Sequence, residues 1–231
     1  MKKTFKMVAL MVMAMGLVFA SCGKDDNGTG GPERAEWVDL GLPSGLLWAK
    51  WNLGATAPEE YGDYYYWSET ETKNVYNWST YRYCTVDGEG KVSTLTKYNT
   101  GSEYGTVDNL TSLEATDDVA TLRVVNGARM PSQEEWQELI DNTTAEWTQV
   151  NGVNGRKLTA SNGNSIFLPA AGRRWGGELR YLGESGNYWS SSLYADDPRY
   201  AWDFYFGSEN QRMGHYYRDD GLSVRPVRSA R

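Results

Sequence analysis

The residues best suited to chemistry are the acids and the single histidine of residues 173–220. Among these acids, the candidates for a catalytic pair are the aspartates Asp196, Asp197, Asp203, Asp219 and Asp220. A glycosidase would need two carboxylates that face each other across a cleft, but adjacent acids in turns are more often solvated or capping groups. No serine stands in a G-x-S-x-G nucleophile elbow, and His215 is better suited to a ligand contact than to general-base catalysis. The pattern predicts that the protein is not an enzyme.

Cysteine and histidine are too scarce for a zinc site. The chain has two cysteines, Cys22 and Cys84, and one histidine, so thiolate or imidazole ligation is not expected. No cofactor and no metal are predicted. A Ca²⁺ site is the alternative, because oxygen ligands are plentiful around residues 196–197 and 219–220, although the spacing of an EF-hand is missing.

Aromatic residues are dense in the same part of the chain and favour binding. Ten of the thirty residues from Tyr188 to Tyr217 are aromatic, more than a small sheet can bury. Tyrosine and arginine beside asparagine and serine make adaptable recognition surfaces, and the same rings can stack on sugars. We predict a glycan or protein ligand, bound through loops after residues 172, 193 and 206. The candidate ligand-binding residues are Arg173, Arg174, Trp175, Tyr181, Tyr194, Asp196, Asp197, Arg199, Tyr200, Tyr205, Asn210, Arg212, His215 and Tyr216.

Three apolar-aromatic runs predict the strands that position these candidates. The runs are Tyr188–Leu193, Tyr200–Phe206 and Leu222–Val227. The polar segments between them, 194–199 and 207–221, are interpreted as loops, the second containing His215 and a solvent-facing Arg218. A two-residue period assigns three rings of the middle run to the core: Trp202, Phe204 and Phe206.

The clearest helix signal lies in Pro131–Asp141. Ser132 is followed three residues later by Glu135, the pattern of a capping box, and an apolar stripe follows on one face. Downstream, Asn-Gly steps at Asn151 and Asn162 predict hairpins between short strands.

The remaining segments carry weaker signals. Two short strands around a Pro-Ser-Gly turn are expected in residues 37–53, and a helical turn at 117–120. Residues 70–116 are interpreted as a loop-rich insertion with short strands, and residues 173–186 as a glycine-punctuated loop.

The first residues predict export and lipid anchoring. A basic start is followed by the apolar run 7–20, which is shorter than the about 20 residues of a membrane-spanning helix. The Ala-Ser-Cys ending resembles a bacterial lipobox, so residues 1–21 are predicted to be a signal peptide and Cys22 the acylated residue. Polar residues 22–36 form the expected flexible tether, and Lys-Asp-Asp behind Cys22 is similar to a surface-export signal. The predicted location is the outer membrane, exposed at the cell surface.

Charge narrows the class of partner. Removing residues 1–21, which carry three lysines and no acid, would change the net charge from −7 to −10. An acidic protein lacks the basic footprint that nucleic acid requires, so no nucleic-acid partner is expected. The about 200 remaining residues suit one domain, expected at 37–231.

Several motifs occur in an order that carries a family resemblance. They are Val38–Trp48, Ala128–Ser132 leading to Glu135-Trp136, Phe167–Gly172, Tyr188–Ser192 and Ser223–Arg228. Taken together, they resemble the Fibrobacter succinogenes major paralogous domain of Bacteroidetes surface proteins. The resemblance covers most of residues 37–228 and is weakest over 70–116.

This resemblance implies an α+β, C-type-lectin-like fold similar to that of formylglycine-generating enzymes. Such a fold has a small twisted antiparallel sheet, about two helices and long loops near a ligand face. Trp189 would be core and Arg225 would pair with a carboxylate or carbonyl. Formylglycine-generating enzymes of this fold need a pair of active-site cysteines. That pair has no counterpart in this chain, since Cys84 lies outside the matching motifs. Related lipoproteins include variable proteins of diversity-generating retroelements, so the resemblance implies that this protein could be one of them. The alternatives to a ligand-binding function are a structural or adhesive appendage component, or an enzyme acting on surface glycans.

Overall fold

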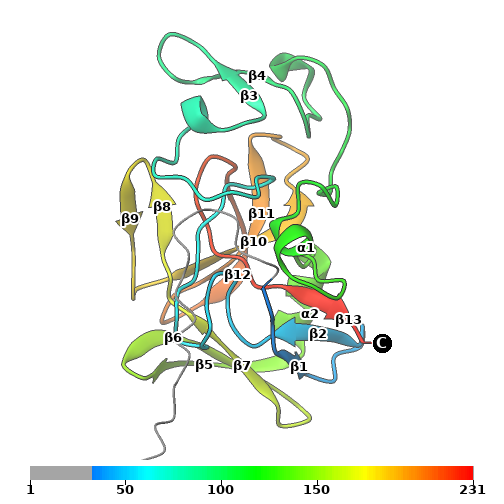
Figure 1. Ribbon diagram of the computed structural model, residues 1–231, viewed down its shortest axis with the longest axis vertical. Helices are drawn as coiled ribbons and strands as arrows, with labels where there is room; N and C mark the ends of the chain where they lie inside the picture. The colour runs from blue at the N-terminus through cyan, green and yellow to red at the C-terminus, as the bar shows by residue number, and fades with distance from the viewer. Residues whose placement is uncertain (1–32, 231) are drawn as a thin grey trace, which may run out of the picture. The chain divides into compact units, whose positions relative to one another are not determined.

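The computed structural model describes residues 33–230. The predicted signal peptide, Cys22 and the tether up to residue 32 lie outside the described residues. Within the described part the chain is α+β and mainly sheet, with small antiparallel sheets and two α-helices (Figure 1). In chain order the elements are β1 (Trp37–Asp39), β2 (Leu46–Ala49), the 3-10 turn η1 (Trp78–Thr80), β3 (Cys84–Val86), β4 (Val92–Leu95), the 3-10 turn η2 (Ser102–Tyr104), α1 (Val119–Arg123), α2 (Gln133–Asp141), β5 (Thr143–Val150), β6 (Val153–Ala160), β7 (Ser165–Pro169), β8 (Arg173–Trp175), β9 (Glu178–Arg180), β10 (Gly186–Leu193), β11 (Tyr200–Phe206), β12 (Gln211–Tyr217) and β13 (Val227–Ser229).

Strands β5, β6 and β7 form the meander that the Asn-Gly steps predict. Asn151 and Gly152 both have positive φ, 49° and 81°, which is the backbone of a type I′ turn. That turn twists in the same sense as the strands it joins, so β5 and β6 pair without a break from Thr143↔Ala160 to Val150↔Val153. The predicted hairpins are confirmed.

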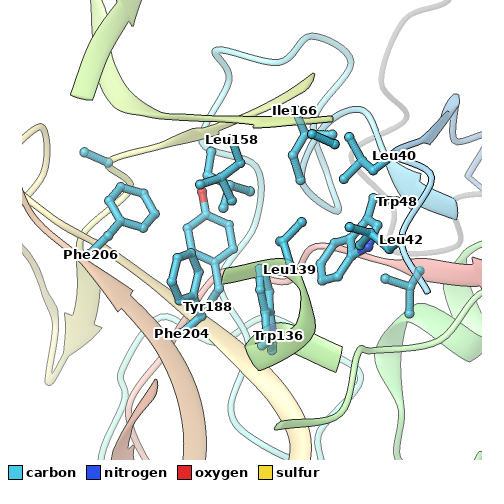
Figure 2. Close-up of a cluster of buried hydrophobic side chains, with 14 residues drawn as sticks. Leu40, Leu42, Trp48, Trp136, Leu139, Leu158, Ile166, Tyr188, Phe204 and Phe206 are labelled. Carbon is cyan, nitrogen blue, oxygen red and sulfur yellow. The ribbon is translucent and has the colours of Figure 1, made fainter. Parts of the chain in front are cut away.

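Helix α2 begins at the predicted capping box and buries the predicted stripe. The Ser132 hydroxyl accepts a hydrogen bond from the backbone N–H of Glu135, and the Glu135 carboxylate accepts one from the backbone N–H of Ser132. Trp136 and Leu139 then point into the core. Figure 2 shows them between side chains of the β5–β6–β7 sheet and rings of the C-terminal sheet, where Trp136 stacks on Phe204 at 5.0 Å. Helix α2 therefore joins two sheets.

The C-terminal sheet has the order β10-β11-β12 and has core on both faces. One face packs Tyr188, Phe204 and Phe206 against the α2 core. The other face packs Trp189, with Leu193 and Ala201, against a second core that includes Tyr65, Trp67 and Leu222. Trp189 is fully buried, as the resemblance implies, and its indole N–H donates to the Tyr65 carbonyl at 2.8 Å.

Two of the predicted strand assignments at the C-terminus are wrong. Segment 207–221 is not a loop throughout, because β12 lies within it and pairs with β11 along its whole length. Run 222–227 does not form the third strand of that sheet. It makes single bridges to Tyr65 and Tyr188 and then enters β13, which pairs with β2. The apolar character of this run reflects burial between sheets, and the polar character of β12 reflects a half-exposed edge strand.

Segment 173–186 is also more ordered than expected. It was predicted to be a loop, but β8 and β9 form a short hairpin through Arg173↔Arg180 and Trp175↔Glu178. Arg174 also exchanges two backbone hydrogen bonds with Gly221, at 2.8 and 2.9 Å. The hairpin is thereby attached to the segment that leads out of the C-terminal sheet.

The loop-rich segment 70–116 surrounds a buried arginine. Arg218, predicted to face solvent, is fully buried and donates to the hydroxyl of Tyr81 and the carbonyls of Lys97, Tyr98 and Pro198. The prediction is wrong because five hydrogen bonds from distant carbonyl and hydroxyl groups replace hydration of the guanidinium. Arg218 therefore attaches this segment to the end of β12.

Arg225 also joins segments that are distant in the sequence. Its guanidinium is fully buried and donates to Asn52 Oδ1 at 2.7 and 3.0 Å, to the Ala49 carbonyl at 3.0 Å and to the Phe167 carbonyl at 2.9 Å. The expectation that it pairs with a carbonyl is confirmed. Burial lowers the pKa of Arg225 to about 10, so the group remains charged at neutral pH.

We expect Arg225→Met to lower the free energy of unfolding by about 3 kcal/mol or more, because it leaves three buried acceptors without a donor. Urea denaturation of the purified protein measures this change. The matched control is Arg34→Met, since Arg34 is exposed and its loss should cost less than about 0.5 kcal/mol. Equal stability of the two variants would contradict the role assigned to Arg225.

Candidate functional site

The strand register divides the predicted binding residues between the two faces of the C-terminal sheet. Residues directly opposite each other in an antiparallel pair point to the same side. Tyr200 pairs with Tyr217, and Trp202 pairs with His215. Tyr194, just past β10, adds its ring to this group. We call these five residues, Tyr194, Tyr200, Trp202, His215 and Tyr217, the aromatic face.

The rings of the aromatic face contact one another closely. Tyr194 stacks on His215 with ring centroids 4.2 Å apart, and Tyr200 stacks on Tyr217 at 4.1 Å. Trp202 meets the Tyr194 ring edge to face at 5.2 Å. His215 and Tyr217 are exposed, and the other three side chains are partly buried. Mutual stacking holds the rings in fixed orientations and leaves part of each open to a ligand.

Trp202 corrects one of the core assignments. Phe204 and Phe206 are fully buried as predicted, but Trp202 on the same side of β11 is only partly buried. Phe204 is covered by Trp136 of α2, whereas the ring partners of Trp202 are Tyr194 and His215. One side of one strand therefore changes from core to surface along its length.

An arginine–carboxylate pair borders the aromatic face. Arg199 donates from Nε and Nη2 to the two carboxylate oxygens of Asp197, at 3.0 and 2.6 Å. Burial acts to raise the pKa of Asp197, but the hydrogen bonds from Arg199 outweigh it and leave that pKa below its ordinary value. The guanidinium lies 5.9 Å from the Tyr200 ring and 5.1 Å from the Tyr104 ring. The pair thus fixes the loop between β10 and β11.

A groove of about 490 Å³ adjoins the aromatic face. Its walls come from the start of α2, the segment at 111–112, the end of β10 and the ring of Trp202. The groove contains two of the predicted residues, Tyr194 and Asp196. Its volume is within the range of about 300–1,000 Å³ that is usual for small-ligand sites.

The other predicted residues of the sheet belong to the opposite face. Tyr205 pairs with Arg212, whose guanidinium lies 4.7 Å from the tyrosine ring. Arg173 reaches the same side from β8, donates to Asp220 at 2.7 Å and lies 4.8 Å from the Tyr216 ring. The sheet separates this group from the aromatic face, so the predicted residues do not form one site.

Three aspartates behind this opposite face, Asp203, Asp219 and Asp220, are buried; for Asp219 and Asp220 this contradicts the expectation that adjacent acids in turns are solvated or capping. Burial raises the pKa of Asp203 to about 7 and that of Asp220 to about 6. Burial and then the charge of Asp220 raise the pKa of Asp219 to about 7. Asp203 accepts a hydrogen bond from Asn187 at 2.7 Å and lies under Gly214, where an added Cβ would be 2.9 Å from its Oδ1. The prediction fails because neighbouring strands and the β8–β9 hairpin cover these acids.

Four predicted residues lie apart from both groups or at their margins. Arg174 lies against the Tyr64 ring at 5.2 Å, and Trp175 is 46% exposed beside Arg180 on the β8–β9 hairpin. Tyr181 is 50% exposed just after that hairpin. Asn210 is exposed in the turn between β11 and β12. Trp175, Tyr181 and Asn210 are exposed, whereas Arg174 is partly buried and lines a separate cavity with Tyr64 and Tyr76.

The possible metal ligands and the thiol of residues 33–230 can be located in the structure. No group of three or more acidic, histidine or cysteine side chains is placed there to hold a metal ion. Cys84 is a free, half-buried thiol whose Sγ lies 3.1 Å from the Trp78 carbonyl, and burial raises its pKa to about 11. A thiol with so high a pKa is a poor nucleophile at neutral pH.

Sequence reasoning missed the polar wall of the groove. Thr111, Ser112 and Gln133 lie far from the C-terminal stretch in the sequence, and nothing in their local pattern links them to it. Tyr217 was detectable, because it has the same two-residue relation to His215 that Trp202 has to Tyr200.

Comparison with known proteins covers part of the chain. Residues 143–227 match a family described as a domain of unknown function, DUF8237. The matched segment runs from β5 to the start of β13 and includes every residue of the aromatic face. No curated protein and no solved structure matches the chain. Within residues 33–230, no helix is both long and apolar enough to cross a membrane.

The buried aspartates generate a prediction about pH. A carboxyl whose pKa is higher in the folded than in the unfolded chain stabilises the fold below its unfolded pKa of about 4, and this contribution is lost as pH rises through the folded pKa. For Asp203 and Asp219, whose folded pKa is about 7, the loss falls between about pH 4 and pH 8. The free energy of unfolding should therefore be lower at about pH 8 than at about pH 5.

We expect Asp203→Asn, which cannot ionise, to reduce that pH dependence and to be more stable than the wild type at about pH 8 by about 1 kcal/mol or more. Urea denaturation at both pH values measures the difference. An identical pH dependence in wild type and variant would contradict the raised pKa of Asp203.

Proposed function

We propose that the protein is a non-catalytic binding protein of the bacterial cell surface, which recognises a glycan or protein ligand through its aromatic face. The domain is C-type-lectin-like and related to the Fibrobacter major paralogous domain. It is tethered to the outer membrane by lipid on Cys22. The observation that carries the proposal is the set of five partly open rings in mutual contact at one end of the C-terminal sheet, two pairs stacked and Trp202 edge to face with Tyr194.

The placement of these rings supports recognition. Surface rings on two paired strands lose little conformational freedom when a ligand binds, because the strands and the stacking already orient them. The adjoining Asp197–Arg199 pair and the groove supply polar groups beside the rings. Interfaces commonly combine such aromatic anchors with a polar rim.

The acids of the C-terminal stretch favour binding over catalysis. Asp197 is held by two hydrogen bonds from Arg199, and Asp203 and Asp220 lie behind the opposite face. A glycosidase would need two carboxylates converging on one cleft. The groove contains Glu134 and Asp196, but Glu134 accepts a hydrogen bond from Ser132 and Asp196 is exposed.

Variants on the two faces of the C-terminal sheet test whether the aromatic face binds the ligand. We expect a Tyr194→Ala/His215→Ala variant to lose at least about tenfold in affinity for any ligand found on glycan and protein arrays, because it removes a central stacked pair. The melting temperature should change little, since neither residue contacts the α2 core. Array binding and differential scanning calorimetry measure the two quantities.

The matched variant is Tyr205→Ala/Arg212→Ala, which removes a ring and its contact partner from the opposite face. It should bind like the wild type. Loss of binding in this variant alone would assign recognition to the opposite face and contradict the proposal. Concentration-dependent self-association abolished by Tyr194→Ala/His215→Ala, without any array ligand, would support an appendage component instead.

The lipid anchor is tested separately. We expect Cys22→Ser to abolish incorporation of labelled fatty acid and to release the protein from the outer-membrane fraction, because acyl chains supply the membrane affinity. The control is Cys84→Ser, which removes the other cysteine and should leave both properties unchanged. Membrane retention of Cys22→Ser would contradict lipid anchoring through this residue.

A further inference from the structure

The groove beside the aromatic face has a lining that points to one class of ligand. We propose that it binds an uncharged carbohydrate chain, with sugar faces against Trp202 and Tyr194 and sugar hydroxyls against the polar wall. This inference rests on the proposed function and specifies the ligand of that site. Nothing in the match to a domain of unknown function assigns a ligand to this groove.

The first argument is the pairing of rings with hydroxyl and amide groups. Seven of the eleven lining residues carry hydroxyl, amide or carboxylate side chains, and two more are the rings of Tyr194 and Trp202. A sugar presents an apolar face of C–H groups and a rim of hydroxyls, so it needs this combination. A peptide anchor would need a deep apolar pocket. Leu193, which could supply one, is only 3% exposed.

The second argument concerns hydrogen-bonding capacity that the fold leaves unused. Within residues 33–230, the side chains of Thr111, Ser112, Gln133 and Asp196 have no hydrogen-bond partner. By contrast, Ser192 Oγ accepts a hydrogen bond from the backbone N–H of Gln133 at 3.1 Å and is part of the framework. Hydroxyl, amide and carboxylate groups together both donate and accept, as recognition of sugar hydroxyls requires.

The third argument is rigidity. The wall at 111–113 is attached to β10, since Leu193 donates to the Thr111 carbonyl at 2.9 Å and Leu113 donates to the Ser191 carbonyl at 2.9 Å. The start of α2 is held by the Gln133–Ser192 hydrogen bond and by its capping box. The three walls are therefore preorganised, which reduces the entropy lost on binding.

Charge selects among carbohydrates. The lining contains two carboxylates, Glu134 and Asp196, and no lysine or arginine. The nearby Arg199 is engaged with Asp197 through two hydrogen bonds. A sialylated, uronic-acid or sulfated chain would place like charge beside these carboxylates without a cation to offset it, which costs free energy. The site therefore favours neutral sugars.

The experiment compares neutral and acidic oligosaccharides on one array, with the purified protein and five variants. The panel contains neutral chains of glucose, mannose, galactose and N-acetylglucosamine, and sialylated or uronic-acid chains of matched length. We expect binding to neutral chains and little change between about 0.05 and 0.5 M salt, since no ion pair is formed. Isothermal titration calorimetry then gives the affinity for the best ligand.

The variants distinguish the effect of groove-lining residues from that of α2 residues outside the groove. Thr111→Val and Gln133→Ala each remove unused hydrogen-bonding groups and should weaken binding by about tenfold. Gln137→Ala, one turn further along α2 on its exposed side, is the matched control and should bind like the wild type. Trp202→Ala should abolish binding, and circular dichroism establishes that each variant is folded.

Each other outcome has a distinct meaning. Binding only to acidic chains or to a protein, lost in Tyr194→Ala/His215→Ala but intact in Gln133→Ala, would overturn this inference and leave the proposed function standing. Absence of binding to every neutral chain would also overturn it. Neutral-chain binding that neither Trp202→Ala nor Tyr194→Ala/His215→Ala alters would overturn the inference and the proposed function together.

Discussion

The structure depends on a small number of buried arginines that join segments distant in sequence. Arg225 connects Asn52 and the end of β2 to β7, and Asn52 in turn donates to the hydroxyl of Tyr188 in β10. Tyr188 donates to the Pro169 carbonyl. A guanidinium can donate to several carbonyl and amide oxygens at once. One arginine side chain can therefore join segments that no backbone hydrogen-bond ladder connects. A two-stranded sheet is marginally stable at best on its own, and packing of the small sheets against one another and against α2 buries both cores.

The C-terminal sheet shows how core and surface share one set of strands. Helix α2 covers only the part of the sheet around Phe204, because Trp136 reaches no further along β11. Beyond that point the same side of β11 carries Trp202 and Tyr200, and rings from β12 and Tyr194 complete the aromatic face. The site is thus the uncovered continuation of a packed face. Its rigidity derives from the core beneath it.

Sequence signals that act within one turn predicted local structure correctly. They failed for residues whose burial depends on partners distant in the sequence. Ser132 with Glu135, and Asn151 with Gly152, act through neighbours within the same turn, so the α2 start and the β5–β6 hairpin were predictable. The burial of Arg218 depends on Tyr81 and Tyr98, more than a hundred residues away, and no periodicity encodes it. The aromatic face was predictable only in part. The two-residue period placed Trp202 on the side of Phe204, but the extent of α2 coverage decides where that side becomes surface.

Strand alternation has a consequence for how such a surface can change. Tyr200 and Trp202 belong to the aromatic face, whereas Ala201 and Asp203, between and beside them, point into the opposite side of the sheet. A substitution at Tyr200, Trp202 or His215 therefore alters the exposed side of the sheet and leaves the neighbouring core side chains in place. A sheet arranged in this way tolerates variation on its exposed side at little cost to its stability, because the side chains that hold the core alternate with those that vary.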